Sequence, residues 1–131
     1  MNNRADKVIR EFYDLWEVFK QNTNKLEFIQ STIQNNSDFT EGMITVLDGI
    51  LKEREIVVCK LLEKISNYAK DPAFEKLFNE TYTVGGFGFM LDISHKLEVE
   101  LLALKSYDIF TQKLYTPTYP LSEYPYVPIM L

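Results

Sequence analysis

The sequence is poor in the side chains that most catalytic, metal and redox centres use. It contains one cysteine and one histidine in 131 residues, so no disulfide can form within the chain. A lone thiol is typical of a reducing compartment. A helical di-iron centre needs two Glu-x-x-His pairs, which a single histidine cannot supply. We therefore predict a non-enzymatic protein without cofactor or metal, located in the cytoplasm or in a virion assembled in a cytoplasm.

Helix breakers and long apolar runs are also scarce. The chain has five glycines and five prolines, and four of the prolines lie beyond Tyr115. No run of apolar residues approaches the ~20 that a membrane-spanning helix needs. The first residues lead into a charged helical pattern, without the apolar core of a signal peptide. These absences predict a soluble protein in which most of the chain is free to form helices.

The sequence contains fewer basic residues than acidic residues. Fourteen Lys and Arg residues stand against nineteen Asp and Glu residues, which gives a formal net charge of −5. Binding to nucleic acid depends on basic side chains that neutralise phosphates, and attraction to anionic membranes depends on them too. The charge balance argues against both of these partners, and we expect protein partners instead.

What the sequence does contain is one unusually wide apolar helix face, between Asp38 and Ala69. Asp38 and Glu41 have the spacing of a reciprocal helix cap, which predicts the start of this helix. At 100° per residue its apolar arc spans roughly 160°, whereas a stripe of ~100° covers one neighbour. The arc comprises Met43, Val46, Leu47, Ile50, Leu51, Val57, Val58, Leu61, Leu62, Ile65, Tyr68 and Ala69. We expect this segment to be a central helix with two neighbours.

Two further long helices are predicted, over residues 5–34 and 89–114. In the first, Ile9, Phe12, Trp16 and Phe19 keep the 3-4-3 spacing of a coiled-coil-like seam, with an irregularity expected near Asn22. Lys70-Asp71-Pro72 ends the central helix and begins a short helix over residues 72–80. A short turn makes the first two helices antiparallel neighbours. The sequence thus predicts an all-α fold, an antiparallel bundle of three long helices plus one short helix.

The character of the chain changes at Tyr115. Prolines exclude helix after this point and favour extended, polyproline-like geometry. Apolar residues are too numerous for the segment to remain comfortably solvated. We predict a helical bundle domain of residues 1–114 and an extended, Pro/Tyr-rich, apolar C-terminal arm of residues 115–131. Its expected anchors are Tyr119, Tyr124, Tyr126 and Ile129.

Two positions for this arm are left open by the sequence. The arm can pack on its own bundle, or it can lie across another subunit. A second apolar stripe on the last long helix, formed by Leu91, Leu102 and Ile109, gives more apolar surface than one neighbour would use. The stripe favours the second position.

Arg54 and Asp108 each lie near the centre of an otherwise apolar helix seam. An unpaired buried charge is very costly, so each needs a partner. If Tyr68 lies level with Ser94 on an antiparallel neighbour, Arg54 comes level with Asp108. We therefore predict an interhelical ion pair between them that fixes the register, with Glu100 or Glu27 as the second choice for Arg54.

Three other motifs have weak chemical interpretations. Asp92 and His95 are three residues apart on a predicted helix, but both lie away from its seam, which favours a solvated flank over a metal site. Cys59 lies one turn from two acidic residues that oppose thiolate formation, which favours a free surface thiol.

The segment Gly85-Gly86-Phe87-Gly88-Phe89 lacks the lysine and the hydroxyl residue of a phosphate-binding loop. It is either a bend that tucks Phe87 and Phe89 into the bundle or an exposed aromatic knuckle that inserts into a partner. The first interpretation is favoured.

These patterns predict a structural or assembly protein that acts through protein–protein contacts of its helical faces and its arm. The expected setting is a homo-oligomer or a larger complex, of which a viral particle is one example. The alternative is a small regulatory or inhibitory protein that binds one cytoplasmic partner. A carrier or enzyme would require a roomy pocket between the helices.

Overall fold

Three long helices make up nearly all of the chain that can be described. The computed structural model describes residues 3–35, 41–72, 76, 86–109 and 114–116. The helices are α1 (Asn3–Asn35), α2 (Glu41–Ala69) and α4 (Gly86–Ser106). Within the described residues there is no β-strand, which confirms the all-helical class.

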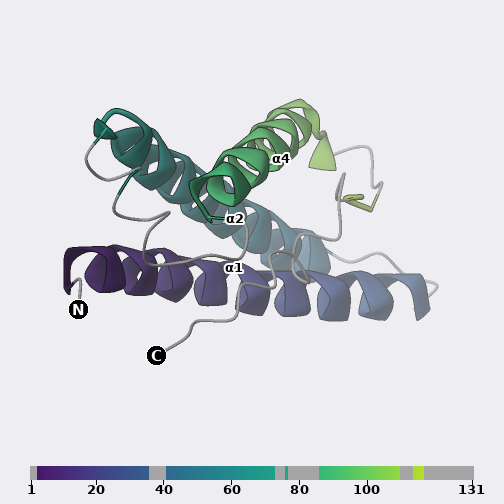
Figure 1. The fold of residues 1–131 in the computed structure, drawn as a ribbon. Helices are drawn as coiled ribbons and strands as arrows, with labels where there is room; N and C mark the ends of the chain where they lie inside the picture. Colours follow the sequence, from purple (N-terminus) through teal and green to yellow (C-terminus); the bar gives the residue numbers. More distant parts are fainter. Residues whose placement is uncertain (1–2, 36–40, 73–75, 77–85, 110–113, 117–131) are drawn as a thin grey trace.

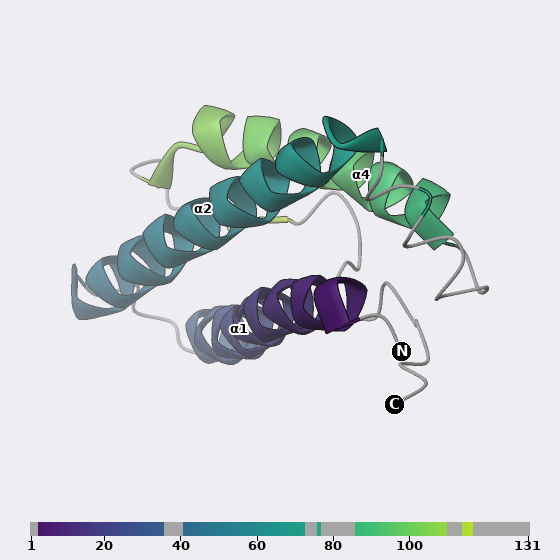
Figure 2. The same ribbon diagram turned by 60° about the vertical axis from the view of Figure 1, so that its left-hand side comes forward.

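Helix α2 is the central helix of the three. It packs against both α1 and α4, as its wide apolar arc predicts. Figures 1 and 2 show α2 and α4 crossing each other on one side of α1. Between α1 and α2, Lys64 Nζ lies 3.3 Å from Glu11 Oε2, and Lys25 Nζ lies 3.5 Å from Glu53 Oε1. Residue numbers on α2 therefore fall as those on α1 rise.

The core consists of two apolar clusters. The first core cluster comprises Phe12, Trp16, Phe19, Val57, Val58, Leu61, Ile65, Ile93 and Leu97, and so draws on all three helices. The second core cluster comprises Leu26, Ile29, Ile33, Leu47, Leu51 and Tyr115. Their apolar side chains recur at helical spacing along α1 and α2, which is the pattern that favours these helices in the sequence. Buried polar residues of α1 and α2 lie between the two clusters in sequence.

Helix α1 runs without interruption through Asn22, where an irregularity was expected. Asn22 does not compete with its own helix for hydrogen bonds, because its side-chain amide donates across to the carbonyl oxygen of Ile50 at 2.9 Å. The hydroxyl of Thr23 donates to the carbonyl oxygen of Phe19, one turn back along the same helix, at 3.1 Å. Both polar side chains are thereby accommodated within a regular helix.

Helix α4 begins and ends earlier than the sequence predicts. It includes Gly86, so the backbone of Phe87 and Phe89 is helical and does not form a bend. Glycine costs a helix only about 1 kcal/mol relative to alanine, which packing along the rest of α4 can offset. The helix ends at Ser106, not near residue 114, and the Ser106 hydroxyl donates to the carbonyl oxygen of Ala103 at 3.2 Å. Tyr115, nine residues after the end of α4, is buried in the core.

Several predicted features lie outside the described residues. These are the cap at Asp38, most of the short helix at 72–80, and the arm beyond Thr116. In the described part of the chain, no helix combines the length and the apolar character needed to cross a membrane.

Candidate functional site

Arg54 is a fully buried guanidinium on the central helix. Its Nε donates to Oε1 of Glu100 on α4 at 2.7 Å, and the Glu100 side chain is itself buried. Charge-assisted bonds of this length are about twice as strong as neutral ones. Two charges removed from water repay their desolvation only when further hydrogen bonds complete the arrangement.

Those further bonds come from α1. Arg54 Nη1 donates to the side-chain oxygen of Asn22 at 3.1 Å and to the hydroxyl of Thr23 at 2.8 Å. The carbon of the guanidinium lies 4.2 Å from the centre of the Phe19 ring, a cation–π contact. Arg54 therefore ties α2 to both of its neighbouring helices.

A buried polar layer is formed by Asn22, Thr23, Arg54 and Glu100. Tyr115, which lies outside the helices, completes this layer. Its hydroxyl donates to Glu100 Oε1 at 2.7 Å, and its backbone carbonyl accepts a hydrogen bond from the side-chain amide of Gln30 on α1. Its ring meets that of Tyr107 edge to face, with centroids 5.4 Å apart. The first residue of the predicted arm is thus fixed in the core of the bundle.

The environment of Tyr115 keeps its hydroxyl protonated. Burial raises the pKa of Tyr115 well above its ordinary value of 10.0, and the hydrogen bond to the Glu100 carboxylate raises that pKa further. Arg54 acts in the opposite direction and lowers it. The phenol therefore stays a hydrogen-bond donor to Glu100, while Glu100 accepts from both Arg54 and Tyr115. The layer is suited to holding segments together rather than to transferring protons.

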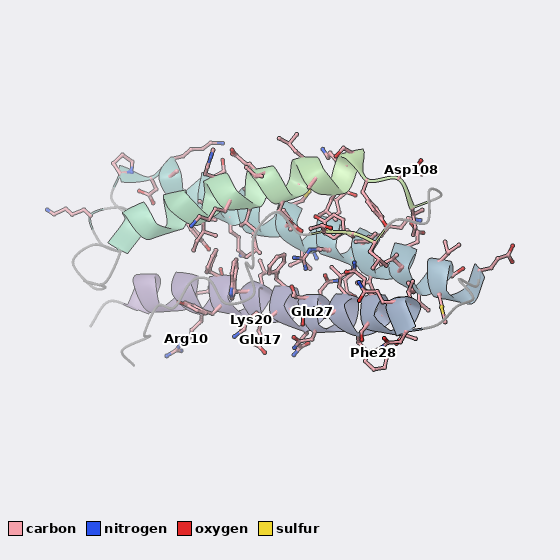
Figure 3. The ribbon with its side chains drawn as sticks, turned by 90° about the vertical axis from the view of Figure 1, so that its right-hand side faces the viewer. Arg10, Glu17, Lys20, Glu27, Phe28 and Asp108 are labelled. Carbon is pink, nitrogen blue, oxygen red and sulfur yellow. The ribbon has the colours of Figure 1, made fainter. Side chains whose placement is uncertain are left out.

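The carboxylate partner of Arg54 is Glu100, not Asp108. Asp108 lies beyond the end of α4 and is exposed (Figure 3). The predicted register assumed a helix that continues to residue 114, whereas α4 ends at Ser106. Glu100 is eight residues before Asp108, or about 12 Å along a helix. The second-choice partner from the sequence is therefore the one that the structure brings to Arg54.

An exposed apolar hollow lies between α1 and α2. It is lined by Asn24, Lys25, Phe28 and Ile29 of α1 and by Val46 and Ile50 of α2, and its volume is about 510 Å³. The side chain of Phe28 is 75% exposed and that of Val46 is 51% exposed. Figure 3 shows Phe28 on the outer side of α1, so it borders the hollow at its edge. Large apolar side chains gathered around one hollow are typical of a surface that binds a partner.

The remaining predicted site residues are placed as follows. The side chains of Phe87 and Phe89 lie outside the described residues, and so do Tyr119, Tyr124, Tyr126 and Ile129. His95 and Cys59 are both exposed on their helices. Among the described side chains, no group of three His, Cys, Asp or Glu residues is placed to hold a metal ion.

The spacing of the α1 seam already includes Thr23, but sequence reasoning missed the hydrogen bonds of Asn22 and Thr23 with Arg54 and the buried position of Tyr115. Asn22 and Thr23 read as poor helix formers, but they occupy the position on the α1 seam between Phe19 and Leu26. That placement is a signal that they face the core, where they need partners. Nothing in the sequence around Tyr115 separates it from the other tyrosines that follow.

The hollow was missed for a different reason. Val46 and Ile50 were assigned to the buried arc of the central helix, yet Val46 is exposed and Ile50 is half-buried. A helical wheel gives the width of an apolar face, but it does not show where the neighbouring helix stops covering it.

Comparison with known proteins found no matching family model, no matching curated protein and no matching solved structure.

Proposed function

We propose that this chain is a non-enzymatic structural or assembly protein that acts through protein–protein contacts of its helical faces and C-terminal arm. The observation that carries this proposal is the exposed apolar hollow, with Phe28 on α1 facing solvent beside Val46 on α2. Singly exposed apolar residues are ordinary, whereas a contiguous set around a hollow marks an interaction surface. Leu102 on α4, 68% exposed, adds apolar surface on another helix.

The architecture proposed for this role is an antiparallel bundle with a short fourth helix over residues 72–80 and an extended arm over residues 115–131. The partner is a second copy of the chain or a larger complex, such as a viral particle, in a cytoplasmic setting. The net charge of −5 supports protein partners over nucleic acid or membrane surfaces.

The buried charges support a structural role. Arg54 and Glu100 are bonded to each other and to side chains of other segments, so they connect parts of the fold. Reactive groups are more often perturbed and accessible in a cleft. His95 and Cys59, the side chains best suited to chemistry, lie exposed on α4 and α2.

Light scattering on the full chain after size-exclusion chromatography tests the proposal. We expect a mass greater than one chain, rising with protein concentration. A full-length variant with Tyr124→Ser, Tyr126→Ser and Ile129→Ser should have a lower mass at the same concentration, because three apolar anchors of the arm are lost. A monomer at all concentrations would contradict self-association and favour the alternative, a small regulatory protein that binds one cytoplasmic partner.

A further inference from the structure

The hollow between α1 and α2 is suited to an extended apolar segment. Its floor and walls are mainly the side chains of Phe28, Ile29, Val46 and Ile50. Lys25 is the one charged residue in its lining, and it lies near Glu53 at the surface. A ligand for this hollow should therefore be mainly apolar, because the charge of Lys25 is already paired with Glu53.

Residues 117–131 of the chain have this chemistry. They include three tyrosines, two leucines, a valine, an isoleucine and a methionine, and their only charged side chain is Glu123. Four prolines favour an extended backbone that loses little entropy on binding. At ~3.1 Å per residue in polyproline geometry, fifteen residues reach about 46 Å.

The described chain ends on the wrong side of α1 for this segment to reach its own hollow directly. The backbone carbonyl of Tyr115 accepts a hydrogen bond from the side chain of Gln30, and the following residue, Thr116, is exposed. Gln30 and Phe28 are two residues apart on α1, so they point about 160° away from each other around the helix. The segment would have to wrap around a helix about 10–12 Å wide, a bend that is opposed by prolines favouring a semi-rigid extended backbone.

We propose that the hollow lined by Phe28, Ile29, Val46 and Ile50 binds residues 117–131 of a second copy of this chain. Tyr115 fixes the root of each arm in its own bundle, and the arm extends to the hollow of the neighbouring copy. Such an exchange joins copies without any change in the helices. This inference rests on the proposed function, since it identifies the partner surface and the partner segment for self-assembly.

A photo-crosslinking experiment on the full chain tests the proposal. Isotopically light protein carries the substitution Phe28→p-benzoylphenylalanine, and isotopically heavy protein carries the natural sequence. The two are mixed in urea, refolded together and irradiated, and the crosslinked peptides are identified by mass spectrometry. The matched control places the same photoreactive residue at Ile56, which is also an exposed apolar residue but lies outside the hollow.

We expect crosslinks from position 28 to heavy peptides within residues 117–131, and at least tenfold fewer such crosslinks from position 56. Crosslinks from position 28 to the arm of the same light chain only would overturn the proposal, because the arm would then fold back on its own bundle. Crosslinks from position 28 to other peptides, in a protein that light scattering shows to be oligomeric, would also overturn it while leaving the proposed function intact. A monomer at all concentrations would contradict this proposal and the self-association on which it rests.

A second measurement uses the affinity of self-association. In the full chain, Phe28→Asp places a carboxylate in the hollow and should weaken self-association about tenfold or more, as measured by analytical ultracentrifugation. The matched control Ile56→Asp adds the same charge at an exposed apolar position of α2 outside the hollow, and it should change the affinity of self-association less than twofold. Equal effects of the two substitutions would contradict the assignment of the hollow.

Discussion

Arg54 and Glu100 show how a buried charge depends on several partners at once. The guanidinium is bonded to the carboxylate and to two side chains of α1, and the carboxylate also accepts a bond from Tyr115. Removal of one member of such a pair leaves the other desolvated without compensation. Replacement of both by apolar groups removes that penalty.

This dependence predicts a strongly non-additive pair of substitutions. Arg54→Met should lower the free energy of unfolding by about 3–5 kcal/mol, because it leaves the Glu100 carboxylate buried without its cation. The double variant Arg54→Met/Glu100→Leu should be more stable than either single variant. Urea denaturation followed by circular dichroism measures all three. A double variant as unstable as the sum of the two single ones would show that the charges do not depend on each other.

Tyr68 predicts the behaviour of the fold in alkali. Burial, and to a lesser degree the nearby Glu11 carboxylate, raises the pKa of Tyr68 from 10.0 to about 12. In the unfolded chain the phenol ionises near pH 10, so the unfolded state loses its proton first. The contribution of Tyr68 to stability is therefore complete below pH 10 and is lost as the pH rises to about 12. Tyr68→Phe should show a shallower loss of stability across that range.

The measurement is a series of urea midpoints from neutral pH to pH 12 for the natural chain and for Tyr68→Phe, with tyrosinate absorbance recorded in parallel. The difference in urea midpoint between the natural chain and Tyr68→Phe should be constant below pH 10 and should change above pH 10. Parallel curves over the whole range would show that the Tyr68 phenol titrates alike in the folded and unfolded chain.

The helices were the most predictable part of this molecule, and their ends and neighbours were the least. Apolar spacing gives α1 and α2 because each carries a long periodic stripe, as with Phe12, Trp16 and Phe19. The end of α4 at Ser106 could not be read from the sequence, because apolar residues continue at helical spacing to Leu114. The long-range contact of Tyr115 with Glu100 is likewise encoded by no local pattern.

Helix α2 offers a position where local helix propensity can be tested alone. Gly49 lies in the middle of this helix, is exposed, and has open space within 4 Å of where a Cβ would lie. Gly49→Ala should therefore raise the free energy of unfolding by about 0.5–1 kcal/mol, through reduced backbone entropy in the unfolded chain. Thermal unfolding with unchanged oligomeric mass measures this gain. A loss of stability would mean that the surface at Gly49 contacts a partner closely.

At the scale of the whole molecule, the described residues form two apolar clusters, and the polar layer around Arg54 lies between them. Trp16, the only tryptophan, belongs to the first core cluster, and Tyr115 belongs to the second. Helices α1, α2 and α4 all pass through or border both regions, so we expect them to unfold together. Trp16 fluorescence and helical circular dichroism should give the same urea midpoint in the natural chain.

Arg54→Met should separate the unfolding transition reported by Trp16 fluorescence from the one reported by helical circular dichroism. The substitution weakens the connection between the two clusters while leaving each of them intact. The fluorescence of Trp16 would then report a midpoint different from that of the helical signal. Different midpoints already in the natural chain would show that the two clusters are independent. Coincident midpoints in Arg54→Met would show that apolar contacts alone couple them.

The polar layer also provides a way to recognise distant homologues of this protein. Asn22, Thr23, Arg54, Glu100 and Tyr115 satisfy one another from four separate segments, so the loss of any one leaves the others with an energetic defect. Surface positions, and core positions at which one apolar residue replaces another of similar volume, can change at a smaller cost. A diverged homologue with little remaining similarity should therefore still carry this five-residue signature at comparable intervals along its chain.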